Sequence, residues 1–110
     1  MVYEIYLGAQ RLSINSALSY SSDEILKPGQ LVIVPIRDQQ VFGVVVQAST
    51  DSRPKIKHII KSLPHYLSKE NIELINWLRL YYPSPLSSIV QLFMPPQSID
   101  RVENTSKETI

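Results

Sequence analysis

Two β-branched runs joined by a short polar turn constrain the fold of this chain more than any other feature. The first run, residues 31–36 (LVIVPI), follows the turn-forming pair Pro28-Gly29, and the second, residues 41–48 (VFGVVVQA), follows the polar stretch Arg37-Asp38-Gln39-Gln40. β-branched residues favour strands, and a polar turn between two such runs is typical of an antiparallel hairpin. The chain is therefore predicted to be built on a small antiparallel sheet or barrel.

Three more short strands are predicted from composition and alternation. Residues 3–9 contain β-prone tyrosine and isoleucine, and residues 16–20 form a shorter candidate. Residues 55–61 begin with strict alternation, which places Ile56 inward and the lysines outward. Five short strands separated by turns predict a small antiparallel β-barrel.

The hydrophobic period changes after Pro64, and a helix is predicted to follow. Ser68 is a residue type that caps helices, and Pro83 ends the run, so the helix is expected from Lys69 to about Tyr82. Apolar residues recur through this segment at roughly helical spacing, namely Ile72, Ile75, Leu78 and Tyr82.

A second, shorter helix is predicted over residues 86–93, with Ser84 as its cap and Pro85 at its first position. The fold class is therefore α+β, with a small antiparallel β-barrel followed by two short C-terminal helices. Residues 1–96 are expected to form the folded domain, β-rich up to residue 63 and helical over 68–94. Residues 97–110 are polar and are expected to be a linker or a disordered tail.

Length and composition favour one domain of the reducing cytosol. A chain of 110 residues with 44% hydrophobic content is long enough to bury one core. It contains no cysteine, so neither disulfides nor thiolate metal sites are predicted. The N-terminus lacks a basic region ahead of an apolar run, and no stretch approaches the roughly 20 apolar residues of a membrane span, so neither secretion nor membrane insertion is expected.

Positive charge is concentrated in the middle of the chain, although the formal net charge is only +1. Between residues 27 and 69 the acids are Asp38 and Asp51. The cations of this segment are Lys27, Arg37, Arg53, Lys55, Lys57, Lys61 and Lys69. Such a segment can face the phosphates of a nucleic acid, or its charges can be the solvated faces of ordinary strands and loops.

Residues that could support catalysis are few. His58 and His65 have no acidic cluster beside them, and Glu70 and Glu73 are expected on the solvent face of the first helix. The three glycines are isolated, so no phosphate-binding loop is present. No cofactor and no metal ion are predicted, and an enzyme acting through this chain alone is not expected.

The order and spacing of several motifs resemble a known DNA-binding module. The motifs are Leu18-Ser19-Tyr20, Leu26-Lys27-Pro28-Gly29, Val32-Ile33-Val34-Pro35-Ile36, Gly43-Val44-Val45-Val46, Lys57, Trp77, Tyr81-Tyr82, Pro85-Leu86 and Leu92-Phe93-Met94-Pro95. Over roughly residues 3–96 they resemble the N-terminal 3′ DNA-binding domain of primosomal protein N′ (PriA), the replication-restart helicase of bacteria. The resemblance implies a domain that caps the 3′ end of a nascent strand at a stalled fork. It also implies that helicase and winged-helix domains belong to the same polypeptide if that polypeptide is longer, with residues from Gln97 on as a truncated linker.

The resemblance further implies which residues bind DNA. The family's pocket for the terminal nucleotide corresponds here to Leu18, Ser19 and Tyr20, to Ile36 and Arg37, and to Lys57. Two positions depart from the family, because Ser19 stands where the family has an acid and Arg37 where it usually has glycine. A serine hydroxyl should hold a free 3′ hydroxyl less firmly than a carboxylate does.

Simpler roles remain open for the same residues. Leu18, Tyr20 and Ile36 could belong to the core, and Lys57 could be a solvated lysine of a strand. Trp77, Tyr81 and Tyr82 are expected to pack the helix on the barrel rather than to stack on bases. The alternative to DNA-end recognition is a protein-interaction module that docks a partner on an exposed strand edge and the aromatic end of the helix. In either case a monomer without membrane contact is expected.

Overall fold

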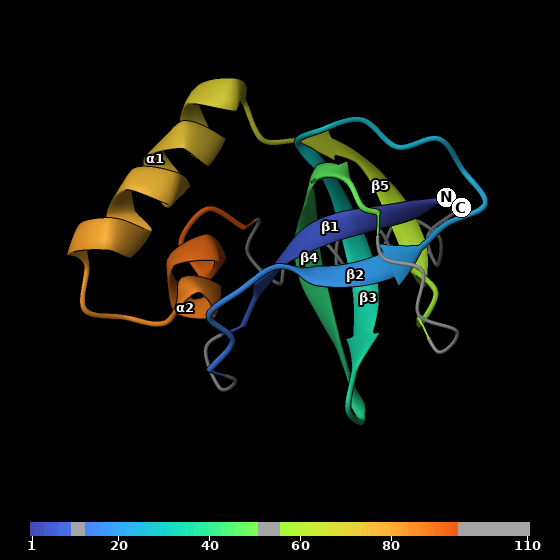
Figure 1. Ribbon diagram of the computed structural model, residues 1–110, viewed down its shortest axis with the longest axis horizontal. Coiled ribbons are helices and arrows are strands. Elements are labelled where there is room, and N and C mark those ends of the chain that lie inside the picture. The colour runs from blue at the N-terminus through green and yellow to red at the C-terminus, as the bar shows by residue number, and fades with distance from the viewer. Residues whose placement is uncertain (10–12, 51–55, 95–110) are drawn as a thin grey trace, which may run out of the picture.

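The computed structural model describes residues 1–9, 13–50 and 56–94, which form an α+β fold (Figure 1). Five strands precede two helices, which confirms the predicted fold class. The elements are β1 (Val2–Gly8), β2 (Leu18–Ser21), β3 (Gln30–Ile36), β4 (Gln39–Ala48), β5 (Lys61–Tyr66), α1 (Lys69–Tyr81) and α2 (Leu86–Gln91). Figure 1 shows both helices on the same side of the sheet and the β3–β4 hairpin projecting away from them. The predicted linker or tail, residues 97–110, lies outside the described residues, as do Arg53 and Lys55.

The five strands form one antiparallel sheet in the order β2-β1-β4-β3-β5. This order leaves β2 and β5 at the two edges, so the sheet is open and barrel-like at most, in contrast to the expected barrel. One parallel bridge between Ser21 and His58 joins β2 to the segment ahead of β5. That segment therefore brings the two edges of the sheet towards each other without a continuous strand pairing.

The central hairpin forms as its sequence predicts. β3 and β4 pair from Leu31 opposite Val44 to Ile36 opposite Gln39, so Arg37 and Asp38 make a two-residue turn. The φ of Arg37 is 52°, and a positive φ at the first of two turn residues is the type II′ pattern that favours glycine. Gly29 has a φ of 90° in the turn that leads into β3, which explains the Pro-Gly pair there.

The predicted fifth strand is wrong in its position. The strand begins at Lys61, where the predicted one ends, and it runs through Leu63 and Pro64 to Tyr66. Leu63 is buried and anchors β5 on the core. Pro64 does not break the strand because β5 is an edge strand, where a missing N–H group need not cost a ladder hydrogen bond. Ahead of β5, residues 57–59 bond to Ser21 of β2, and the Ile60 N–H donates a hydrogen bond of 2.9 Å to the Ile33 carbonyl oxygen of β3.

The first helix matches its prediction, and the second differs at its cap. The Ser68 side chain accepts a hydrogen bond from the Asn71 N–H, as a helix N-cap does. For α2 the N-cap is Pro85, so the predicted cap by Ser84 is wrong, and the Leu86 N–H instead donates a hydrogen bond of 3.3 Å to the Asn15 side-chain oxygen. The helix itself ends at Gln91, two residues before the predicted end at Phe93.

Two hydrophobic clusters lie on opposite faces of the sheet. The helix-side cluster joins the sheet to both helices and contains Tyr6, Leu31, Val44, Leu63, Ile75, Leu86, Ile89, Val90 and Met94. The inner cluster lies on the other face and contains Tyr3, Ile5, Leu7, Tyr20, Leu26, Val32, Val34 and Val45. Neighbouring residues such as Val44 and Val45 belong to different clusters because successive side chains of a strand point to opposite faces.

The expectation that Trp77, Tyr81 and Tyr82 pack the helix on the sheet is wrong. All three side chains are more than half exposed. Ile75 is the buried residue of α1 and defines the side that faces the core. Trp77 lies two residues further on, about 200° around the helix, and therefore on the opposite side.

Candidate nucleic-acid interface

Strand β2 carries the three consecutive residues of the predicted DNA-binding motif. Leu18 and Tyr20 face the inner cluster, Leu18 as a partly buried side chain and Tyr20 with only 3% of its surface exposed. The Tyr20 hydroxyl donates a hydrogen bond of 2.8 Å to the Pro35 carbonyl oxygen. Burial raises the pKa of this hydroxyl above its ordinary value, so it remains a donor across the physiological range.

Tyr20 is therefore the side chain around which the predicted site is assembled. Its hydrogen bond joins edge strand β2 to the end of β3, immediately ahead of Ile36 and Arg37. Ile36 is partly buried against the same cluster as Leu18, and both retain some exposed surface. An apolar surface at this place can hold a base, whereas the Tyr20 ring is buried and supports that surface from within.

Arg37 lies at the tip of the hairpin beside this apolar surface. It is exposed, and its positive φ is the conformation that glycine adopts without a steric penalty. The turn thus has a conformation that favours glycine, and this chain has an arginine there. The guanidinium group can pair with a phosphate or stack on a base.

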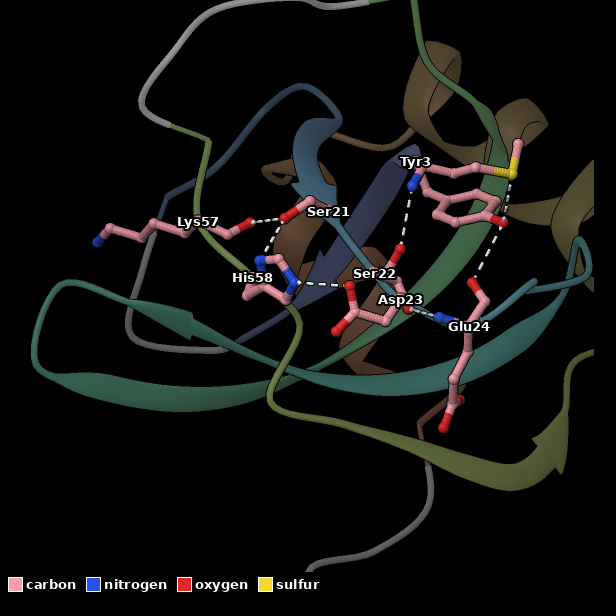
Figure 2. Close-up of polar contacts among 8 residues, drawn as sticks. Tyr3, Ser21, Ser22, Asp23, Glu24, Lys57 and His58 are labelled. Carbon is pink, nitrogen blue, oxygen red and sulfur yellow. Dashed lines mark hydrogen bonds and ion pairs between the residues drawn. The ribbon is translucent and has the colours of Figure 1, made fainter.

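Lys57 is attached to β2 through the backbone rather than through a strand of its own (Figure 2). Its carbonyl oxygen accepts a hydrogen bond of 2.9 Å from the Ser21 N–H, and the Ile59 N–H donates one of 2.9 Å to the Ser21 carbonyl oxygen. Figure 2 shows the Lys57 side chain extending away from these contacts. The Lys57 backbone therefore lies beside Ser21, the residue that follows the Leu18-Ser19-Tyr20 motif, and the ammonium group projects away from this contact.

His58 strengthens this attachment with its side chain. Its Nδ1 atom lies 2.6 Å from the Ser21 hydroxyl oxygen, and its Nε2 atom lies 3.5 Å from an Asp23 carboxylate oxygen (Figure 2). The histidine thus spans β2 and the residues that follow it. This role differs from a metal ligand, and among residues 1–9, 13–50 and 56–94 no three His, Cys, Asp or Glu side chains are placed to hold a metal ion.

Ser19 faces the other side of β2, away from Leu18 and Tyr20. Its hydroxyl oxygen lies 3.2 Å from the hydroxyl oxygen of Ser49. Ser19 pairs directly with Glu4 of β1, whose carboxylate accepts a hydrogen bond of 2.6 Å from the Gln47 side chain. Cross-strand partners lie about 4.5–5.5 Å apart at their Cβ atoms, so the Glu4 side chain starts beside Ser19, and its carboxylate is bonded to Gln47 of the neighbouring strand β4.

The six predicted residues thus come from three segments that meet around Tyr20, but they do not share one surface. Sequence reasoning missed Glu4, because only the register of β1 against β2 shows which residue lies opposite Ser19. In the part of the chain that the structure describes, no helix is long and apolar enough to cross a membrane.

Comparison with known proteins places the chain in a family. The family model of the 3′ DNA-binding domain (3′BD) of PriA matches residues 6–95. The replication restart protein PriA of Rickettsia felis is 40% identical over 74 residues, which cover 64% of this chain and 11% of the relative. PriA of Helicobacter pylori strain 26695 is 33% identical over 86 residues, or 77% of this chain and 14% of the relative. The chain thus spans a small part of the length of these relatives, and it belongs to the PriA 3′ DNA-binding domains, a DNA-binding rather than a catalytic family.

Proposed function

We propose that this domain recognises the free 3′ end of a DNA strand at a stalled replication fork, as part of a PriA replication-restart protein. The observation that carries the proposal is the attachment of Lys57 to Ser21, which fixes the backbone of a lysine beside the residue that follows the motif of β2. Family membership supports DNA as the ligand. We also propose that the domain is monomeric and is joined to helicase and winged-helix domains of the same polypeptide.

The apolar and cationic groups have separate tasks in this proposal. The exposed parts of Leu18 and Ile36 contact the terminal base, and Tyr20 holds the two segments together from within. Arg37 and Lys57 contact phosphates, because both are exposed cations, Arg37 next to Ile36 at the hairpin tip and Lys57 in the segment bonded to Ser21. Stacking or apolar contact with one base contributes roughly 1–3 kcal/mol, and the cations make the affinity depend on salt.

Recognition of the 3′ hydroxyl is assigned to Ser19 and its cross-strand partner Glu4, which lie on the other face of β2, so the end of the DNA strand passes over this edge strand. The Ser19 hydroxyl can donate or accept one hydrogen bond, and the neighbouring Glu4 carboxylate supplies the negative charge that Ser19 lacks. A carboxylate accepts a hydrogen bond from a hydroxyl and repels a phosphate. The pair therefore favours a strand that ends in a free hydroxyl over one that ends in a phosphate.

The experiment that tests this function is fluorescence anisotropy with one labelled single strand that ends in either a 3′ hydroxyl or a 3′ phosphate, each at two salt concentrations. Tighter binding of the hydroxyl end supports 3′-end recognition. Equal binding of both ends contradicts it and leaves a general single-strand surface. Absence of binding to either end contradicts DNA binding altogether and favours the alternative of a protein-interaction module.

A further inference from the structure

The outer side of α1 carries a strip of exposed apolar side chains. The residues of this outer strip and their exposed fractions are Leu74 at 44%, Trp77 at 55%, Leu80 at 75% and Tyr81 at 69%. The rings of Trp77 and Tyr81 lie against each other, with centroids 4.8 Å apart. Because Ile75 on the opposite side packs on the sheet, the helix is apolar on both sides. A helix with that pattern is typical of a position between two layers of protein.

The orientation of α1 is fixed, so the outer strip cannot turn towards the core. The Tyr6 hydroxyl of β1 donates a hydrogen bond of 2.8 Å to the Asn76 side chain. The Arg79 guanidinium donates to the Tyr6 hydroxyl at 3.2 Å and to the Asn15 carbonyl oxygen at 3.1 Å. These contacts lie on the same side of the helix as Ile75 and hold it on the sheet.

The charges around the outer strip disfavour DNA as its ligand. Glu70 and Glu73 precede Leu74 and Trp77 by one helical turn each, and both are exposed. The Arg79 guanidinium is engaged with Tyr6 and Asn15 rather than with the strip. A single-strand site combines aromatic residues with cations, whereas the exposed charges of α1 one turn before the strip are two acids and one cation, Lys69, at the start of the helix. A protein surface that matches the strip is therefore apolar at its centre and bordered by basic residues.

The size of the outer strip favours a tethered partner. With roughly 150–250 Å² for each aromatic side chain, the exposed parts of the strip amount to about 500 Å². A standard interface between separate proteins takes about 800 Å² from each partner, so a freely diffusing second copy is not favoured. A partner in the same polypeptide needs less contact area because the linker supplies a high effective concentration.

We propose that the outer strip docks on another domain of the same polypeptide, through an apolar surface with a basic rim on that domain. The relatives leave ample sequence for such a domain, since the matched region is 11% of the Rickettsia felis protein and 14% of the Helicobacter pylori protein. The docking places the domain at a fixed orientation relative to the rest of the protein. It does not depend on the DNA site, which lies around β2 and the tip of the β3–β4 hairpin.

Hydroxyl-radical footprinting of the native-length gene product and of the 110-residue chain tests the proposal. Trp77 and Tyr81 are expected to be modified several-fold less in the native-length protein. Tyr66 of β5 is the matched control, because it is as exposed as Trp77, at 55%, and lies outside the strip. Equal modification of Trp77 and Tyr81 in both proteins overturns the proposal, and so does a native product that ends at Ile110. If modification of Trp77 and Tyr81 in the 110-residue chain falls as the concentration of that chain rises, the strip binds a second copy. That result also overturns the proposal.

A substitution separates docking from a general loss of structure. Leu80→Glu in the native-length protein should restore the modification of Trp77 and Tyr81 to the level of the short chain. Ile25→Glu is the control, since Ile25 is 85% exposed in the loop between β2 and β3. Persistent protection in Leu80→Glu, or loss of protection in Ile25→Glu, contradicts a docking contact at the strip. Binding of single-stranded DNA by the short chain should be the same with and without Leu80→Glu.

Discussion

The hydroxyl of Tyr20 donates a hydrogen bond of 2.8 Å to the carbonyl oxygen of Pro35, and this contact connects an edge strand to the tip of the central hairpin. The two residues lie on strands that are not neighbours in the sheet, because β1 and β4 separate β2 from β3. The bond therefore crosses the inner cluster and fixes the distance between the two parts of the proposed DNA site. Its removal should affect stability and DNA affinity together.

Tyr20→Phe removes this hydrogen bond and keeps the ring. We expect the free energy of unfolding to fall by about 1–3 kcal/mol, because the Pro35 carbonyl oxygen loses its partner. For a domain of this size each kcal/mol lowers the melting temperature by roughly 4–8 °C, which calorimetry resolves. Tyr66→Phe is the control, since Tyr66 is exposed and should tolerate the change. An unchanged melting temperature for Tyr20→Phe would contradict the claim that the hydrogen bond between Tyr20 and Pro35 stabilises the domain.

Stability should also decrease at high pH because of Tyr20. Burial raises the pKa of its hydroxyl above the value of 10.0 that it has when the chain is unfolded. Above about pH 10 the unfolded chain loses a proton that the folded chain retains, so the free energy of unfolding falls as the pH rises. Denaturant titrations between about pH 9 and 11.5 should show the stability advantage of the native chain over Tyr20→Phe shrinking. A difference that stays constant over this range contradicts the prediction.

The double substitution Arg37→Ala and Lys57→Ala should weaken binding of single-stranded DNA without unfolding the domain. Both side chains are exposed, so their loss leaves the core intact. For two phosphate contacts the slope of log K against log salt should become less steep by about 1.4. Anisotropy at several salt concentrations measures the slope. Lys69→Ala, at the start of α1, is the control, and an unchanged slope in the double variant excludes the proposed phosphate contacts.

Arg37→Gly should separate stability from binding. Glycine adopts a positive φ without the steric cost that an L residue incurs, so we expect the free energy of unfolding to rise by up to about 1 kcal/mol. DNA affinity should fall, because the guanidinium group is lost. Arg37→Ala keeps the strain and should lower the affinity without the gain in stability. Equal stability of the glycine and alanine variants contradicts the strained turn.

Much of the fold could be predicted because its signals are local. The paired β-branched runs predict the β3–β4 hairpin, and the Ser68 cap with the stripe around Ile75 predicts α1. The start of β5 could not be predicted, because alternation at residues 56–60 looks the same whether the segment joins the sheet or attaches to β2. Periodicity also fails for Trp77, since a helix that is apolar on both sides does not reveal which side faces the core.

The candidate site was predictable only in part, for a different reason. The motif on β2 and the position of Lys57 follow from the resemblance to a family, and the structure brings their segments together around Tyr20. Once residues 18–21 are known to form β2, strand alternation predicts that Ser19 faces away from Tyr20. That Glu4 lies opposite Ser19 depends on the register between two strands, which the intervening loop sets and which no local pattern encodes.

Glu4→Gln tests the proposed recognition of the 3′ hydroxyl most directly. Glutamine has nearly the same shape and can still bond with Gln47, so the sheet should remain intact. The variant loses the charged acceptor, and the preference for a 3′ hydroxyl over a 3′ phosphate should fall by about tenfold, which corresponds to about 1.4 kcal/mol. Part of this change should appear as tighter binding of the phosphate end, because a like charge has been removed.

Glu24→Gln is the matched control for this variant. The Glu24 carboxylate also accepts a hydrogen bond of 2.6 Å, from Ser62 of β5, and it lies outside the site. If both variants keep the full preference, Glu4 takes no part in reading the strand end, and selectivity must come from Ser19 alone.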